Sequence, residues 1–291
     1  MAQASPTRRN GATERPGEDT IVSVERAFEI VTMLADASEG ASLAEIARHL
    51  DVNKAIALRL LATLEGIGIA WHDDVAQRYN LTYRVSNLGL RQLQRTRLLD
   101  QSAAVLKGLA EETGELVRLA VVENGDRITW VYAVSGARRL LQIDPNYGLD
   151  AYLHTTAIGK AWLATLPFET ALKYMLRQGI EPMTKHTKVT PKAIRAELEA
   201  TRKRGYATSF EETALGVIAI AAPIMVTALN GARECVGAVS LAAPTNRMNA
   251  RELVACSPQL LATVERLAQI WPLEPRTLRV LSAPRALPVP S

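Results

Sequence analysis

The sequence predicts an α+β protein in two parts, a small helical N-terminal unit and a larger unit that mixes strands and helices. Residues 21–113 show mostly the spacing of amphipathic helices, whereas residues 115–271 alternate strand-like apolar runs with helices. The length of 291 residues is enough for about two domains. Hydrophobic residues at 48% and charged residues at 22% are typical of a globular protein and exclude a disordered or fibrous chain.

The composition excludes several further classes of protein. The longest apolar run contains Pro223 and is shorter than the roughly 20 residues that a membrane-spanning helix needs. The N-terminal segment lacks the apolar stretch of a secretory signal. The two cysteines, Cys235 and Cys256, have no CxxC spacing, which excludes a disulfide scaffold and a cysteine zinc site. We therefore expect a cytoplasmic protein that needs no metal or other cofactor.

The net charge of +4 is too small to indicate nucleic-acid binding by itself. The first 97 residues carry equal numbers of acidic and basic side chains, so any contact with DNA must depend on where the charges lie. Residues 78–97 stand out because they contain no acidic residue and five arginines: Arg78, Arg84, Arg91, Arg95 and Arg97.

The changes of pattern define the expected domain boundaries. Residues 20–82 form the first domain, residues 83–97 a linker helix, and residues 98–271 the second domain. Residues 1–19 are polar and without periodicity, and we expect a disordered tail there. Residues 272–291 are rich in proline and are expected to form an extended tail.

The first domain begins with two helices. We expect Ser23 to cap the first helix, Gly40 to end it, and one apolar stripe to be buried, formed by Val24, Ala27, Phe28, Val31 and Leu34. Ser42 and Glu45 form a capping box, in which each side chain binds the other residue's backbone amide. A short second helix is therefore predicted over residues 43–50.

A turn and a third helix follow. Asp51 and Val52 form the turn, and Asn53 caps a helix that runs to about residue 67, with its inward face formed by Ala57, Leu60, Leu61, Leu64 and Ile67. A short helix, a turn and a second helix whose first turn is polar make a helix-turn-helix. Two strand-like runs on either side of the polar residues 72–77 add a wing.

In this layout the second helix of the motif enters the major groove, while the wing and the linker arginines lie near phosphates. Arg59 can pair with guanine, and Lys54 with guanine or a phosphate. Ile56 and Leu58 either contact thymine methyl groups or belong to the core, and the sequence favours neither. The predicted DNA-binding residues are Ser42, Arg48, Asn53, Lys54, Ala55, Ile56, Leu58, Arg59 and Arg78. A helical module that binds protein instead of DNA is the alternative.

The second domain begins with an amphipathic helix over residues 98–113 that ends at Gly114. Asn124 and Gly125 form a hairpin turn between two strands, residues 116–122 and 128–134. Further strands are expected at residues 140–143, 217–225 and 235–241, and further helices at residues 157–166, 191–204 and 257–271.

Several segments, in the same order, resemble the IclR family of bacterial transcription regulators. They are residues 23–27, 42–47, 54–64, 153–161, 204–206, 211–212 and 236–240. The resemblance spans about residues 21–271. It implies a winged helix-turn-helix, a C-terminal GAF-like domain that binds a small effector, assembly into dimers or tetramers, and most often repression. Ala55-Ile56 replace the family's common Ser-Thr, and Leu58 replaces a frequent His or Tyr, so we expect an operator that differs from the family average.

The resemblance also implies an effector pocket. It would be formed by Ala157, Ile158, Ser209, Val217, Ala219, Ser240 and Ala242, with Leu141 and Ile143 as its wall. Members that bind small keto acids carry Asp, Cys and Ser where this chain has Ser209, Ala219 and Ala242. Because a buried carboxylate needs hydrogen-bond donors, we expect a larger or more apolar effector, such as an aromatic compound. The amides at the start of the 157–166 helix stay available to an anion. Each apolar position can equally be ordinary core.

An enzyme is not expected. Gly159-Lys160 is not part of a phosphate-binding loop, because His154 and Ala161 stand where that motif needs Gly and Ser or Thr. The four histidines are scattered, and no GxSxG motif is present. We interpret His154 as a capping or packing residue, Glu211 and Glu212 as surface residues, and Cys235 as buried and inert.

The sequence therefore predicts a DNA-binding transcription regulator whose operator binding is modulated by a small molecule. The alternatives are a small-molecule sensor whose helical domain binds protein, and an enzyme with an appended helical domain.

Overall fold

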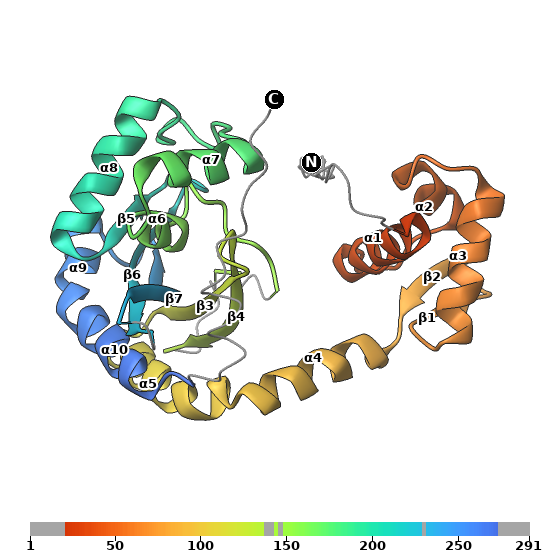
Figure 1. Cartoon of the computed structure of the whole chain (residues 1–291), viewed down its shortest axis with the longest axis horizontal. Helices are drawn as coiled ribbons and strands as arrows, with labels where there is room; N and C mark the ends of the chain where they lie inside the picture. The colour runs from red at the N-terminus through yellow and green to blue at the C-terminus, as the bar shows by residue number, and fades with distance from the viewer. Residues whose placement is uncertain (1–20, 137–142, 145–147, 229–230, 273–291) are drawn as a thin grey trace. The chain divides into compact units, whose positions relative to one another are not determined.

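The computed structural model describes residues 21–136, 143–144, 148–228 and 231–272 (Figure 1). The chain divides into two compact units, Met1–Arg95 and Thr96–Ser291. The mixture of helices and a sheet confirms the predicted α+β class. Both predicted tails lie outside the described residues, as does Leu141 of the predicted pocket wall.

The first unit is a three-helix core with a two-stranded wing. The wing strands pair antiparallel, and Ala41 forms a bridge to Tyr79. The core between helices and wing contains Ile30, Leu34, Ile46, Ala57, Leu61 and Leu64. In chain order the elements are α1 (Val22–Asp36), α2 (Leu43–His49), α3 (Lys54–Gly66), β1 (Ala70–Asp73), β2 (Arg78–Leu81) and α4 (Tyr83–Thr96).

Side-chain caps fix the starts of α2 and α3 as predicted. The backbone N–H of Ser42 donates to the Glu45 carboxylate at 2.8 Å, and the N–H of Glu45 donates to the Ser42 hydroxyl at 3.3 Å. Asn53 Oδ1 accepts the N–H of Ile56 at 2.9 Å. Because these bonds satisfy amides that have no partner inside a helix, they set where each helix begins.

Four expectations for this unit are wrong. Helix α1 begins at Val22, before Ser23, and has no side-chain cap. It ends at Asp36, before the predicted end at Gly40. Phe28 is 68% exposed, although its spacing placed it in the buried stripe, and Val24 on the same helix is also exposed. Ile67 follows the end of α3 and is exposed as well. These apolar side chains lie on faces that the rest of the unit does not cover.

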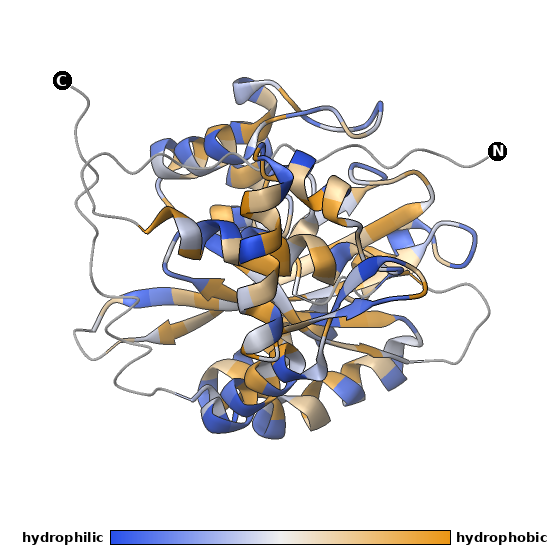
Figure 2. Ribbon diagram, turned by 90° about the vertical axis from the view of Figure 1, so that its right-hand side faces the viewer, coloured by the Kyte–Doolittle hydropathy of each residue, from blue (hydrophilic) through white to orange (hydrophobic). Residues whose placement is uncertain are grey.

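The second unit is built on a five-stranded antiparallel sheet in the order β4-β3-β7-β6-β5. Its strands are β3 (Leu116–Glu123), β4 (Arg127–Ser135), β5 (Ala207–Phe210), β6 (Val217–Thr227) and β7 (Arg233–Pro244). The predicted hairpin joins β3 to β4, with Asn124 and Gly125 both at positive φ. The central strands are apolar along most of their length, because helices cover both faces of the sheet (Figure 2).

Two helical layers enclose this sheet. Helices α5 (Leu98–Thr113), α9 (Ala250–Ala255) and α10 (Ser257–Ile270) pack against one face. On the other face, which we call the inner face, lie α6 (Ala157–Leu163), α7 (Phe168–Gln178) and α8 (Pro191–Arg204). Figure 1 shows α6 in front of the sheet and α8 outside it.

The sequence missed or misplaced some elements of the second unit. Helices α7 and α9 and strand β5 were not predicted, and α6 ends at Leu163 instead of residue 166. Most of the strand expected at residues 140–143 lies outside the described residues, and Ile143, which is described, is not part of a strand. The predicted linker helix ends at Thr96, and Arg97 takes a left-handed conformation with φ 51° before α5 begins.

Candidate functional site

Helix α3 has one covered and one open face. Ala57, Leu61 and Leu64 are buried in the core of the first unit. The open face and its cap carry six of the predicted DNA-binding residues, all exposed: Asn53, Lys54, Ala55, Ile56, Leu58 and Arg59. Arg48 is exposed on α2. Ile56 is 36% and Leu58 47% exposed, so the alternative that they belong to the core is excluded within this unit.

The turn between α2 and α3 holds this face in place. Asp51 adopts φ 51°, and the N–H of Val52 donates to the carbonyl of Ala47 at 3.0 Å. Ser42 uses its hydroxyl within the capping box, where it donates to Glu45 at 2.9 Å. The structure thus gives Ser42 a capping role, and its predicted DNA contact stays a prediction.

Arg78 is bonded inside the first unit. Its guanidinium donates to the carbonyl oxygens of Glu39 and Gly40, each at 3.0 Å, and to the Glu45 carboxylate at 3.1 Å. These bonds tie β2 to the loop before α2 and to the α2 cap. Gly40 permits this approach, since a Cβ there would lie 2.4 Å from the carbonyl of Tyr79. The predicted phosphate contact of Arg78 is therefore not needed to explain its position.

The wing ends in a tight turn. The Asp73 carboxylate accepts the backbone N–H groups of Val75 at 2.9 Å and Ala76 at 3.0 Å. These hydrogen bonds lower the pKa of Asp73. Val75 at the tip is 96% exposed. Three arginines of the acid-free stretch are exposed on α4: Arg84, Arg91 and Arg95.

The second unit brings most of the predicted effector residues to the inner face of the sheet. Ser209 on β5, Ala219 on β6 and Ala242 on β7 form one row of directly paired residues. Ala157 and Ile158 on α6 pack into the same core as Ala219 and Ala242. Ser240 lies on the same face, two residues from Ala242, and Val217 stands half-buried at the start of β6. Ile143 is half-buried and packs against this core.

The hydroxyl groups of this face differ in their bonding. Ser209 Oγ donates to the carbonyl of Thr155 at 2.7 Å, which fixes β5 to the segment before α6. Ser240 is 1% exposed, and its hydroxyl has no hydrogen-bond partner in the described part of the chain. Ser240 therefore keeps a free donor in the core.

The packing of helix α6 accounts for Gly159 without a phosphate-binding role. A Cβ on Gly159 would lie 2.6 Å from both the Cα and the carbonyl oxygen of Leu153, so only glycine lets the helix lie this close to the preceding segment. Thr156 caps the helix by accepting the N–H of Gly159 at 3.0 Å. The helix has seven residues, shorter than the sequence indicated.

Lys160 is buried in an ion-pair cluster. Its ammonium group lies 2.8 Å from the Glu212 carboxylate, which Lys188 also contacts at 2.8 Å. Burial lowers the pKa of Lys160, and the neighbouring carboxylates of Glu212 and Glu197 oppose this shift. Glu212 is 2% exposed, so the expectation that it is a surface residue is wrong.

His154 and Cys235 agree with their predicted roles. His154 is buried, its Nε2 lies 2.9 Å from the carbonyl of Glu181, and burial lowers its pKa. Cys235 packs against the inner core, and burial raises the pKa of its thiol to about 12.

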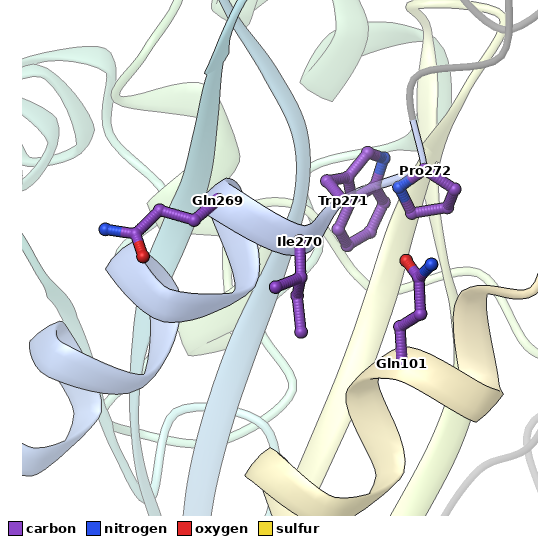
Figure 3. A pocket seen from close by; sticks show the side chains of 5 residues that line it. All are labelled: Gln101, Gln269, Ile270, Trp271 and Pro272. Atoms are coloured by element: carbon purple, nitrogen blue, oxygen red, sulfur yellow. The ribbon is translucent and has the colours of Figure 1, made fainter.

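A cavity of about 460 Å³ lies elsewhere, between α5 and the end of α10 (Figure 3). Its lining is Gln101, Gln269, Ile270, Trp271 and Pro272. It includes none of the predicted effector residues and no ionisable side chain. Among the described residues there is no cluster of His, Cys, Asp and Glu that could hold a metal ion, and no helix long and apolar enough to cross a membrane.

A winged helix-turn-helix unit with an open face on its second motif helix, joined to a unit built on an antiparallel sheet covered by helices, is the architecture of a DNA-binding regulator with a second, larger domain. Family models narrow this class. Residues 23–74 match the IclR helix-turn-helix domain, and residues 90–269 match the bacterial transcriptional regulator IclR C-terminal domain. The chain belongs to the IclR family of transcriptional regulators, which confirms the resemblance seen in the sequence.

Individual relatives agree with this assignment. The HTH-type transcriptional regulator BhcR of Paracoccus denitrificans is 31% identical over 90% of this chain and 92% of its own. The transcriptional repressor IclR of Escherichia coli is 27% identical over 83% and 86%. The crystal structure of an IclR transcriptional regulator from Alicyclobacillus acidocaldarius shares the fold, with a TM-score of 0.75, 23% identity, and coverage of 86% and 98%.

The contacts of Arg78 lead to a stability prediction. We expect Arg78→Ala to destabilise the first unit by about 1–3 kcal/mol, because two loop carbonyls and a carboxylate lose a charged donor. Chemical denaturation of the full chain, followed by circular dichroism, measures this change. Arg91→Ala, which removes an exposed arginine from α4, is the control and should leave stability unchanged. Equal stability of both variants would refute a structural role for Arg78.

Proposed function

We propose that this protein regulates transcription, as a repressor, by inserting α3 into the major groove of an operator. The observation that carries the proposal is the open N-terminal half of α3 on a unit whose core is complete without it. Its exposed side chains include the guanidinium of Arg59, the ammonium group of Lys54 and the apolar side chains of Ile56 and Leu58. Because the chromosome is the target, we place the protein in the cytoplasm.

The exposed residues divide into base-reading and backbone-binding roles. Arg59 is assigned to guanine, where a guanidinium can bind O6 and N7 together. The exposed Ile56 and Leu58 are assigned to thymine methyl groups, since neither has a place in the core. Lys54 and the arginines of α4 are assigned to phosphates, which position the unit without reading sequence.

The DNA-binding proposal predicts a shift of a labelled fragment from upstream of the protein's own gene. Arg59→Ala should weaken binding by about 1–3 kcal/mol and relax specificity at one base pair, because a bidentate contact is lost. Electrophoretic mobility shift with single-base operator variants measures both effects.

Arg266→Ala, at an exposed position of α10, serves as the control and should bind like the unaltered chain. If Arg59→Ala weakens binding equally for every sequence, Arg59 contacts phosphate. If the unaltered chain shifts no DNA, the alternative function, a sensor whose helical domain binds protein, is favoured.

We propose further that the chain works as a homodimer or a homotetramer. Helix α4 has no buried residue in its own unit, and its Leu88 and Leu90 are 48% and 57% exposed. Phe28 and Val24 form a second exposed apolar group on α1. Exposed apolar faces of this kind mark association surfaces. A symmetric pair would present two reading helices to the two halves of a palindromic operator.

Sedimentation equilibrium of the full chain tests this assembly, with a dimer or tetramer expected at micromolar concentration. Leu88→Glu combined with Leu90→Glu should shift the distribution toward monomer, because charges would be placed in the contact. A chain that is monomeric before any substitution contradicts the assembly.

The inner face of the second unit is the proposed effector site. Its predicted residues are apolar or small, and the Ser209 hydroxyl already donates a hydrogen bond to the carbonyl of Thr155. We therefore infer an effector with an apolar body, such as an aromatic compound. Its binding would favour one arrangement of the second units, and α4 would transmit the change to the reading helices, with a coupling of about 1–3 kcal/mol.

A thermal-shift screen compares aromatic acids with short keto acids. We expect aromatic acids to raise the melting temperature more, because burial of a ring adds apolar contact area on the inner face. A clear shift with keto acids alone would contradict the apolar effector.

A further inference from the structure

Arg118 is a buried cation on β3 that forms no ion pair with any of the described residues. Its side chain is on the inner face of the sheet, and the residue is 8% exposed. Its Nε has no hydrogen-bond partner, and within the described residues the guanidinium forms no ion pair. Its guanidinium lies over the ring of Trp130, with 4.9 Å between the guanidinium carbon and the ring centroid.

The position of Arg118 connects it to the proposed effector site. Arg118 pairs directly with Ser240 on β7, and Ser240 pairs with Ala221 on β6, so the three residues form one row. The next row consists of Ala242, Ala219 and Ser209. Directly paired residues point to the same face, and the two rows are two residues apart along each strand. Small side chains therefore surround the cation on the effector side of the sheet.

Two neutral donors near Arg118 are also unsatisfied. The indole Nε1 of Trp130 and the hydroxyl of Ser240 are buried and have no hydrogen-bond partner in the described part of the chain. Buried polar groups are nearly always bonded, so three such donors in one neighbourhood need an explanation. All three donate, and an anion is the group that accepts from all of them.

The charge of Arg118 is unfavourable for folding alone. Burial lowers its pKa to about 10, and the exposed Asp144 opposes this shift. The guanidinium stays protonated at neutral pH, so its positive charge remains in the core with no ion-pair partner in the described part of the chain. A residue that breaks the rule for buried charges is expected where function requires it.

We propose that Arg118 binds a carboxylate of the effector, with Trp130 Nε1 and Ser240 Oγ as additional donors. The alanine-rich rows of β6 and β7 then receive the apolar body of the same molecule. This inference rests on the proposed function and deepens it, since it assigns the effector to the class of carboxylates with an apolar substituent. It also replaces the expectation that the inner face lacks donors for a carboxylate.

The first test needs no ligand. Arg118→Met removes the charge but keeps much of the side-chain volume, and it should raise the melting temperature of the ligand-free chain by about 2–4 °C. Arg266→Met at an exposed site should leave it unchanged. A lower melting temperature for Arg118→Met would assign Arg118 to folding and overturn the proposal.

The second test uses matched acids and amides. Benzoate, phenylacetate and hexanoate are compared with benzamide, phenylacetamide and hexanamide by thermal shift and isothermal titration calorimetry. The unaltered chain should be stabilised by at least one acid and not by its amide. Arg118→Met should lose at least about tenfold in affinity for that acid, and Arg118→Lys should keep part of it, because lysine retains the charge without the fork of donors.

Equal effects of acid and amide, equal acid binding by Arg118→Met, or no effect of any acid would each overturn the proposal. None of these measurements involves DNA. A gel shift with ligand-free Arg118→Met separates the two hypotheses, because the variant should bind the operator fragment as the unaltered chain does, whatever happens to ligand binding.

Discussion

The close packing of α6 against the segment that precedes it is the constraint on which the second unit depends. Gly159 lets α6 lie against the preceding segment at Leu153, and Lys160 on the same helix is buried, where its ammonium group lies 2.8 Å from the Glu212 carboxylate. Removal of one member of such a buried pair typically destabilises a protein by about 3–5 kcal/mol, because the other charge stays behind. This packing brings Ala157 and Ile158 to the inner face and so forms one side of the proposed effector site.

The sequence predicted the reading helix well because its determinants are local. The capping hydrogen bonds of Ser42, Glu45 and Asn53 join residues only three positions apart. The hairpin turn likewise needs only two adjacent residues with positive φ, Asn124 and Gly125. Exposure was harder to predict. The periodicity of α1 marked Phe28 as buried, but burial needs a partner element, and none in the first unit covers that face.

The candidate effector face was predicted only in part. Ala157, Ile158, Ala219 and Ala242 share one core, and their role in effector binding stays a prediction, whereas the buried position of Arg118 and the buried partners of Glu212 were missed. A charged residue in an apolar run gives no signal of its direction, since one residue of register decides whether it faces solvent or core. The pairing of β3 with β7 supplies that register, and it depends on strands more than a hundred residues apart.

The burial of the two cysteines determines how reactive their thiols are. Burial raises the pKa of Cys235 to about 12 and also raises the pKa of Cys256. At neutral pH Cys235 is therefore kept as the neutral thiol, whereas the thiolate is the form that reacts with peroxides and disulfides. Burial therefore disfavours the reactive form of both thiols, most strongly for Cys235.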